Sequence, residues 1–400
     1  MAGTINKTKD IRAFALFFIG WLIYFTQGAL RIHGRFTTLL LIVMLLLSFI
    51  YFFQLVAHNR LNSVLRALSY LLVMFVVYGI VDLFSNHSAI SDDVLDFEYI
   101  KKATISIVPI FGFYYLLRRV NINDKWFVVI LIFFLLSAIG EFFSSRWEME
   151  QKIAEGLIRD RDTKEMVVGA VYRFLPILPL LFYVKNPWVK YSILFVVLVF
   201  AVMGLKRGPL LLCAVSLFVL ILDELKQMRK RVSVVQIVVL IMAIVGGYYA
   251  ITRLIAANDF LVFRFEAMLE GDSSNRDTIY EDVYYQFVNE QNVFLKLFGH
   301  GADSTLRIVG AYAHNDWLEI ALNQGVLGVL LYFLYYFNFL KQWRKTNKNH
   351  DVHMCIGLFL ILTLVTSYLS MSINNNRIAA QFCIAYSLVL AERSSLKKIY

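Results

Sequence analysis

The sequence predicts an all-α membrane protein that crosses a lipid bilayer about twelve times. Its 400 residues are 59% hydrophobic and have a mean hydropathy of +0.63, outside the range of soluble domains. Apolar windows of about 20 residues, the length that spans the hydrocarbon core, recur along the whole chain. Helices suit such windows, because an open sheet edge would leave N–H and C=O groups unsatisfied in lipid.

The predicted spans are apolar stretches separated by polar segments. The eighth span is the shortest, so it could be tilted, broken or partly re-entrant. The alternatives to a total of twelve spans are eleven and thirteen. The spans are 12–30, 36–56, 64–84, 100–117, 126–144, 167–184, 189–205, 208–222, 232–252, 316–340, 353–371 and 377–391.

The distribution of charge predicts that both termini lie in the cytoplasm. With the N-terminus inside, the cytoplasmic segments hold 21 of the 39 Lys and Arg residues but only 6 of the 29 acidic residues. Basic residues concentrated in short loops on one side of the bilayer indicate the cytoplasmic side. The net charge of +10 then divides into +15 inside and −5 outside, so the pI of 9.3 reflects topology and does not indicate nucleic-acid binding.

The chain divides by sequence into three parts. Residues 1–252 hold the first nine spans, 253–315 form one large outer loop with short helices, and 316–400 hold the last three spans. Within the loop, a helix is predicted from about 277 to 290. The three cysteines all fall inside apolar spans without paired spacing, so neither a disulfide framework nor a zinc site is predicted.

The stretch 299–328 is the strongest candidate for an active site. It closes the large outer loop with His314 and Asn315, places Glu319 in the next turn, and runs directly into an apolar helix. A neutral imidazole can take a proton from an attacking hydroxyl near pH 7. Asn315 and Glu319 share a helix face close to His314. The alternative is that Asn315 or its neighbour caps the next helix and His314 is incidental.

Four arginines lie at or near the predicted outer ends of spans or in the outer loop. Arginine presents a planar fork of donors that binds phosphate oxygens and keeps its charge, so several together would suit a diphosphate. Each could instead be an interfacial anchor or pair with an outer acid. These residues are Arg173, Arg207, Arg276 and Arg377, and Lys206 adjoins the second of them.

The order of these motifs resembles the O-antigen ligase and O-antigen polymerase superfamily of bacterial surface-polysaccharide enzymes. The resemblance covers about 200–340, beyond which only span count and topology agree. The family often has Ser before the Arg-Gly pair, where this chain has Lys206. The matching elements are Lys206-Arg207-Gly208-Pro209, Asn275-Arg276, Gly299-His300-Gly301, the run His314-Asn315-Asp316-Trp317-Leu318-Glu319, and Gly325 with Gly328.

The resemblance implies transfer of an oligosaccharide from a polyprenyl diphosphate carrier on the outer face of the bacterial inner membrane, without a metal or nucleotide cofactor. Chemistry on that face has no access to cytosolic nucleotides, which favours a lipid-linked donor. Arg207 and Arg276 would stabilise the charge of the leaving diphosphate, with Arg173, Arg377 and Lys206 as further phosphate-binding candidates. His314 would orient or deprotonate the acceptor hydroxyl, held in place by Asn315 and Glu319.

Three functions are compatible with these motifs, and the polymerase is favoured over the ligase and the flippase. A polymerase would move the growing chain onto another lipid-linked repeat unit, and a ligase would move it onto lipid A core. A flippase for the same lipids would place charged residues in the middle of many spans, and the span centres here are nearly free of them. The expected partners are the lipid-linked donor and acceptor and the bilayer, with a flippase and a chain-length regulator left open as protein partners.

Overall fold

The computed structural model describes residues 7–32, 34–84, 97–120, 124–155, 168–228, 276–370 and 376–396, with five single residues between 241 and 266. All regular structure in these ranges is helical. Ten predicted spans coincide with described helices, whereas the predicted span 167–184 consists of the short helical segments Gly169–Phe174, Ile177–Leu180 and Leu181–Tyr183. Of the predicted span 232–252 only four single residues are described, and much of the outer loop before residue 276 lies outside the described residues. The predicted helix at 277–290 is confirmed as α12 (Arg276–Asn289).

The chain is a membrane-embedded all-α protein. Seven stretches of the described residues are long and apolar enough to cross a membrane, and three shorter apolar helical stretches accompany them. The total of twelve spans and their orientation stay predictions. The seven are Arg35–Ala57, Ser63–Val81, Tyr99–Leu117, Asp124–Ala154, Arg207–Lys226, Asp316–Lys345 and His350–Leu369, and the three are Gly169–Tyr183, Pro187–Met203 and Ile378–Leu390.

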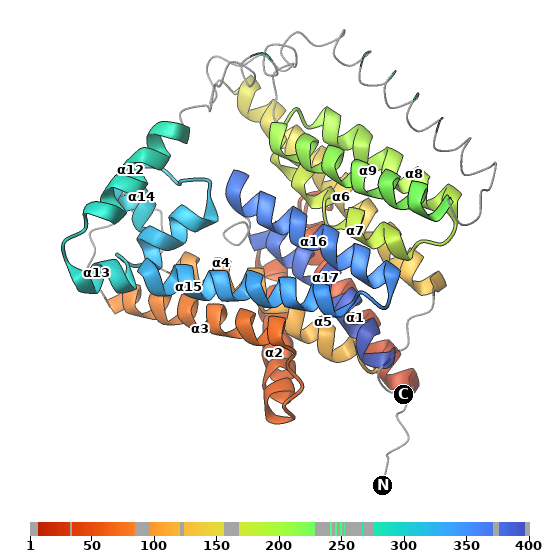
Figure 1. Cartoon of the computed structure of the whole chain (residues 1–400), viewed down its shortest axis with the longest axis horizontal. Helices are drawn as coiled ribbons and strands as arrows, with labels where there is room; N and C mark the ends of the chain where they lie inside the picture. The colour runs from red at the N-terminus through yellow and green to blue at the C-terminus, as the bar shows by residue number, and fades with distance from the viewer. Residues whose placement is uncertain are drawn as a thin grey trace. The chain divides into compact units, whose positions relative to one another are not determined.

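The helices form two compact units, each assembled from separate parts of the sequence. The first unit comprises Met1–Met44, Arg119–Gly271 and the last residues of the chain. Helix α6 (Asp124–Ala154) contacts both α1 (Lys7–Phe25) and the short helix η2 (Gly169–Phe174). Helices α8 (Pro187–Met203) and α9 (Arg207–Met228) lie side by side (Figure 1). The connection between η2 and α8 holds the one-turn helices α7 (Ile177–Leu180) and η3 (Leu181–Tyr183).

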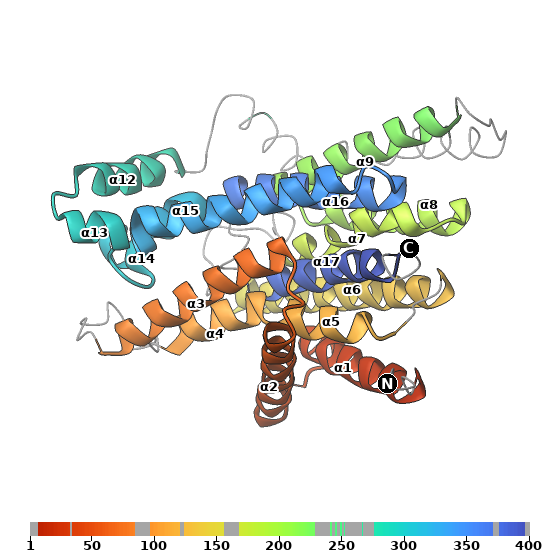
Figure 2. The same cartoon turned by 60° about the horizontal axis from the view of Figure 1, so that its bottom comes forward.

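The second unit comprises Leu45–Arg118 and Asp272–Ser394, and it cuts across the three-part division made by sequence. Its central element is α15 (Asp316–Lys345), which packs against α3 (Ser63–Phe84) and α16 (His350–Leu369). Figures 1 and 2 show the outer-loop helices gathered at one end of α15. These are α12, α13 (Val293–Phe298) and α14 (Ser304–Val309). The unit also holds α4 (Phe97–Ile107), α5 (Pro109–Leu117), most of α2 (Arg35–Ala57) and most of α17 (Asn376–Leu396).

Helix α15 is two helices joined at a break. Gly325 has φ 66° and ψ −162°, outside the helical region, and divides α15 into segments 316–324 and 326–345. The second segment has about 20 residues, and at 1.5 Å per residue it is about 30 Å long, enough to cross the hydrocarbon core unaided. The first segment, with its carboxylates, is therefore not needed to span the bilayer.

Candidate active site

The break in α15 is the docking point for the Gly-x-Gly motif of the outer loop. A non-helical residue at 325 leaves the preceding helix carbonyls without their usual partners. The backbone N–H of His300 donates to the Leu322 carbonyl (2.9 Å), and the N–H of Gly301 donates to the Asn323 carbonyl (3.0 Å). A Cβ atom added at Gly299 would overlap the backbone of Asn323, which explains the need for glycine there. The motif therefore fixes the end of the outer loop to the first segment of α15.

The first segment of α15 carries a carboxylate that is fully buried. The Glu319 side chain is 0% exposed and accepts hydrogen bonds from the Ala313 N–H (2.6 Å) and from the Thr305 hydroxyl. One turn further on, Asn323 accepts from the Ser304 hydroxyl (2.6 Å). These bonds attach α14 and the turn before α15 to the same helical segment. Glu319 therefore holds the backbone next to His314 and lies away from solvent.

Asn315 is the N-cap of α15, which confirms the capping alternative for this residue. Its side-chain oxygen accepts from the backbone N–H groups of Trp317 (2.9 Å) and Leu318 (3.3 Å). Side-chain acceptors at this position satisfy N–H groups that have no partner within the helix. The following residue, Asp316, is also buried, and Tyr332 donates its hydroxyl to it at 3.0 Å. The start of α15 is thus firmly held.

His314 is exposed between these two fixed residues. It has φ 51°, a left-handed conformation that costs a non-glycine residue roughly 1–2 kcal/mol. Ala313 before it and Asn315 after it are buried, and each has the hydrogen bond described above. Residues kept in such conformations by their surroundings are concentrated at functional sites. His314 is thus an exposed residue on a backbone that cannot readily relax.

Arg276 lies on the same unit and is connected to the His314 turn through Tyr280. It begins α12, and its guanidinium donates to the Leu369 carbonyl at the end of α16 (2.7 Å). Burial raises the pKa of Tyr280, and the positive charge of Arg276, together with polar contacts from Arg276 and Asn315, opposes that rise. Tyr280 therefore lies close to both Arg276 and Asn315. The structure brings together two of the residues that the sequence singled out separately.

Lys102 is a basic residue near this site that the sequence interpretation missed. On α4, its ammonium lies 5.7 Å from the centre of the Tyr312 ring and 3.9 Å from a carboxylate oxygen of Asp303. Burial raises the pKa of Tyr312, Asp303 adds to the rise, and Lys102 opposes it. A signal was present in the sequence, because Lys102 stands at the predicted outer end of the span 100–117, where basic residues are disfavoured.

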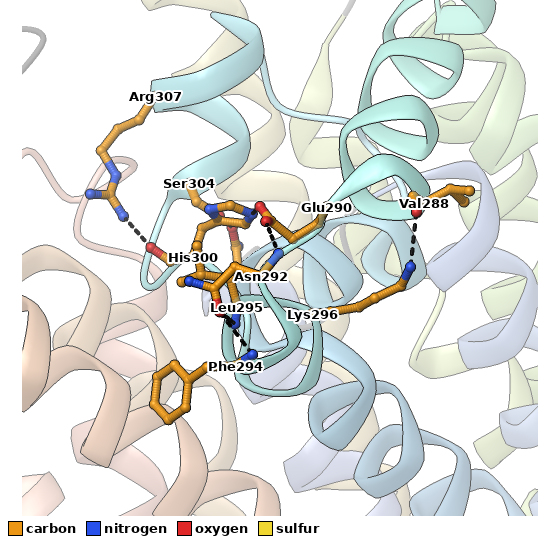
Figure 3. A network of polar contacts seen from close by, with 10 residues as sticks. Val288, Glu290, Asn292, Phe294, Leu295, Lys296, His300, Ser304 and Arg307 are labelled. Carbon is orange, nitrogen blue, oxygen red and sulfur yellow. Dashed lines mark hydrogen bonds and ion pairs between the residues drawn. The ribbon is translucent and has the colours of Figure 1, made fainter.

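His300, the other histidine at the end of the outer loop, is part of a separate polar network. Figure 3 shows its ring facing Glu290, with 3.0 Å between Nε2 and the carboxylate. Arg307 donates to the carbonyls of His300 (3.2 Å) and Ala302 (2.8 Å). This network connects the end of α12 with the Gly-x-Gly motif and α14. Its role is to shape the loop that docks on α15.

Arg173 lies in the first unit, in a buried ion pair. Its guanidinium is 3.3 Å from the Glu141 carboxylate and donates to the Phe25 carbonyl (2.8 Å), while Glu141 also accepts from the Gly28 N–H (2.9 Å). Both side chains are 7% exposed. The pair joins η2, α6 and the residues after α1. This position favours a structural role for Arg173 over the predicted phosphate contact.

The remaining basic candidates are Lys206, Arg207 and Arg377. Arg207 begins α9, and the Lys206 ammonium lies 5.0 Å from the centre of the Tyr172 ring. A Cβ atom at Gly208 would lie 2.5 Å from the Tyr172 hydroxyl, so glycine in the Arg-Gly pair allows that ring to approach. Arg377 is the second residue of α17, and its side chain lies outside the described residues.

The arrangement in the second unit can offer a base to one hydroxyl group and positive charge to an anion. Among the described residues, no group of three or more His, Cys, Asp or Glu side chains is placed to hold a metal ion. Arg276 and Lys102 are the cations near the His314 turn that the contacts above identify. A search for similar proteins found no matching family model and no matching curated protein.

Proposed function

We propose that this chain is a membrane glycosyltransferase that polymerises lipid-linked oligosaccharide repeat units. The donor is an oligosaccharide on a polyprenyl diphosphate, and transfer takes place at the outer face of the bacterial inner membrane. The observation that carries the proposal is the exposed His314 in a left-handed conformation, fixed between the Glu319-bound Ala313 and the N-cap Asn315. The motif order described for the sequence supplies the reaction class.

In this mechanism His314 acts on the acceptor sugar. Its imidazole takes the proton of the acceptor hydroxyl as that oxygen attacks the anomeric carbon of the donor. The bond between the anomeric carbon and the phosphate oxygen breaks, and the polyprenyl diphosphate leaves with the electron pair. Attack opposite to the leaving group inverts the anomeric centre.

Arg276 acts on the leaving group. A guanidinium has five N–H donors on three nitrogens. The hydrogen bond from Arg276 to the Leu369 carbonyl involves one of these nitrogens. Positive charge placed where negative charge develops lowers the barrier most in a site that excludes water. Arg207 stays a second predicted diphosphate contact, to be tested by its own substitution.

The test is reconstitution of the purified protein in vesicles with its lipid-linked repeat unit, followed by gel analysis of the products. A ladder of chain lengths on the polyprenyl carrier is expected. Product only after addition of lipid A core would identify a ligase instead. Movement of the lipid across the vesicle without any transfer would overturn the enzyme assignment.

His314→Ala and His314→Gln are both expected to abolish the ladder, because neither side chain can accept the proton. General-base catalysis typically contributes about 10²–10⁴-fold to a rate. The matched control is His350→Ala, an exposed histidine at the start of α16, which should leave the ladder intact. A full ladder from a correctly inserted His314→Ala protein would refute the assignment.

A further inference from the structure

The short helix α13 exposes nearly all of its apolar side chains. Its sequence is Val-Phe-Leu-Lys-Leu-Phe, and in the described structure Val293 is 69% exposed, Phe294 66%, Leu297 44% and Phe298 39%. The Phe294 and Phe298 rings lie against each other, with 4.8 Å between their centres. We call these four residues the α13 apolar face. Apolar patches of this kind mark surfaces that contact a membrane or another protein.

The single charged residue of α13 is directed away from this face. The Lys296 ammonium donates to the carbonyl of Val288 in the last turn of α12, at 2.9 Å (Figure 3). Asn292 caps the start of α13 by accepting from the N–H groups of Phe294 (3.0 Å) and Leu295 (3.4 Å). The helix is therefore held firmly on its polar side, and the apolar face carries no charge.

Two contacts place α13 at the end of the membrane spans. The Tyr78 hydroxyl, in the last turn of the apolar stretch Ser63–Val81 of α3, donates to the Phe298 carbonyl. The next residue, Gly299, packs against the break in α15, where the 326–345 segment begins. Both contacts put α13 at the level where a helix of about 20 residues leaves the hydrocarbon.

The neighbouring surface of α3 is of the same kind. Val77, Ile80 and Val81 are 49%, 44% and 60% exposed and belong to a stretch apolar enough to cross the bilayer. These residues lie within one turn of Tyr78, whose hydroxyl contacts α13, so exposed apolar side chains are found on both elements that meet there. A hydrophobic side chain exposed at the membrane interface lowers its free energy by entering the acyl region, as the apolar faces of interfacial helices do.

From these observations we infer that α13 is inserted into the membrane interface, with its apolar face in contact with the acyl chains of the leaflet at this end of the spans. The inference goes beyond the proposed reaction and does not depend on it. It assigns to the six residues of α13 the task of holding the outer loop at the lipid surface.

The test measures the depth of a fluorescent label in a phosphatidylethanolamine/phosphatidylglycerol bilayer. The environment-sensitive probe is attached to Phe294→Cys in a full-length background in which Cys213, Cys355 and Cys383 are replaced by Ala. Val293→Cys is a second label position should the first variant fold poorly. Val81→Cys on α3 is the lipid-facing reference, and Asp282→Cys on the exposed surface of α12 is the aqueous control.

We expect the probes at 293 and 294 to emit at shorter wavelength than the probe at 282. Lipids with a spin label high on the acyl chain should quench them, and aqueous iodide should quench them weakly. Emission and iodide quenching equal to those of the probe at 282 would overturn the inference. Protection from both quenchers would also overturn it, because a protein partner would then cover the face.

Discussion

At the scale of single residues, two ionisable side chains at one turn have different tasks because their surroundings differ. Glu319 and His314 are five residues apart, yet Glu319 is fully buried and His314 is exposed. The carboxylate accepts from the N–H of Ala313, immediately before the histidine. Glu319 is therefore a positioning residue in the proposed reaction, in which His314 would act on the acceptor hydroxyl and Arg276 on the leaving group.

Substitution of Glu319 tests this division of roles. Glu319→Ala leaves the buried Ala313 N–H without an acceptor, at a cost of about 1–3 kcal/mol, and should lower both the melting temperature and the rate of polymer formation. Glu319→Gln keeps one acceptor oxygen and should recover most of both, while the pH profile of the rate stays that of the wild type. If a folded Glu319→Gln protein were as inactive as His314→Ala, the carboxylate would be acting in the chemistry itself.

The Arg173–Glu141 pair gives a second prediction at this scale. Removing one partner of a buried pair leaves an uncompensated charge and typically costs about 3–5 kcal/mol. Arg173→Met should therefore lower the melting temperature in detergent strongly, and the double variant Arg173→Met/Glu141→Gln should lower it less. The matched control is Lys185→Ala, which breaks an exposed pair with Asp124 and should have little effect. Equal losses in Arg173→Met and Lys185→Ala would show that the buried pair is not structural.

At the scale of the element, the break in α15 allows one helix both to span the bilayer and to support the outer loop. The 326–345 segment can span the bilayer, while the 316–324 segment carries hydrogen-bonded polar groups. The carbonyls released at Gly325 accept from the outer loop, so the break leaves few backbone groups unsatisfied. An unbroken helix could not accept the loop in this way.

Two glycines with positive φ in the outer loop test this docking. Gly299 (φ 79°, ψ 178°) packs against the Asn323 backbone, whereas Gly310 (φ 81°, ψ 2°) is in the left-handed helical region and has open space around it. Alanine at Gly310 costs roughly 1–2 kcal/mol for the left-handed conformation. At Gly299 the combination of positive φ and extended ψ is essentially restricted to glycine, and a Cβ atom there also overlaps the backbone of Asn323. Gly299→Ala should therefore lower melting temperature and polymer formation well beyond Gly310→Ala. Identical losses at the two positions would mean that the loop does not depend on this contact.

At the scale of the whole molecule, the outer-loop helices belong to the same compact unit as α3, α15 and α16. The predicted orientation can be checked with single cysteines and a label that does not cross membranes. Asp282→Cys on α12 should react in intact cells, and Asn347→Cys between α15 and α16 should react only after the membrane is opened. The reverse pattern would place His314 on the cytoplasmic side and contradict transfer at the outer face.

The sequence predicts the helices well and their mutual contacts poorly. Hydrophobic stretches and a cap such as Asn315 depend on residues close together in the chain, so pattern reasoning finds them. The Arg173–Glu141 pair and the Lys102–Tyr312 contact join residues far apart in sequence, and no local pattern signals them. The break at Gly325 was also hidden, since a single glycine is tolerated in an apolar helix.

The helix break has a consequence for how the protein responds to its membrane. A span adapts to a thinner or thicker bilayer chiefly by changing its tilt. In α15 such tilting acts on the 326–345 segment, while the 316–324 segment is bonded to the outer loop and joined to the span through one glycine. The His314 turn would then keep its geometry in bilayers of different thickness, and the proposed transfer reaction would be insulated from the mechanical state of the lipid.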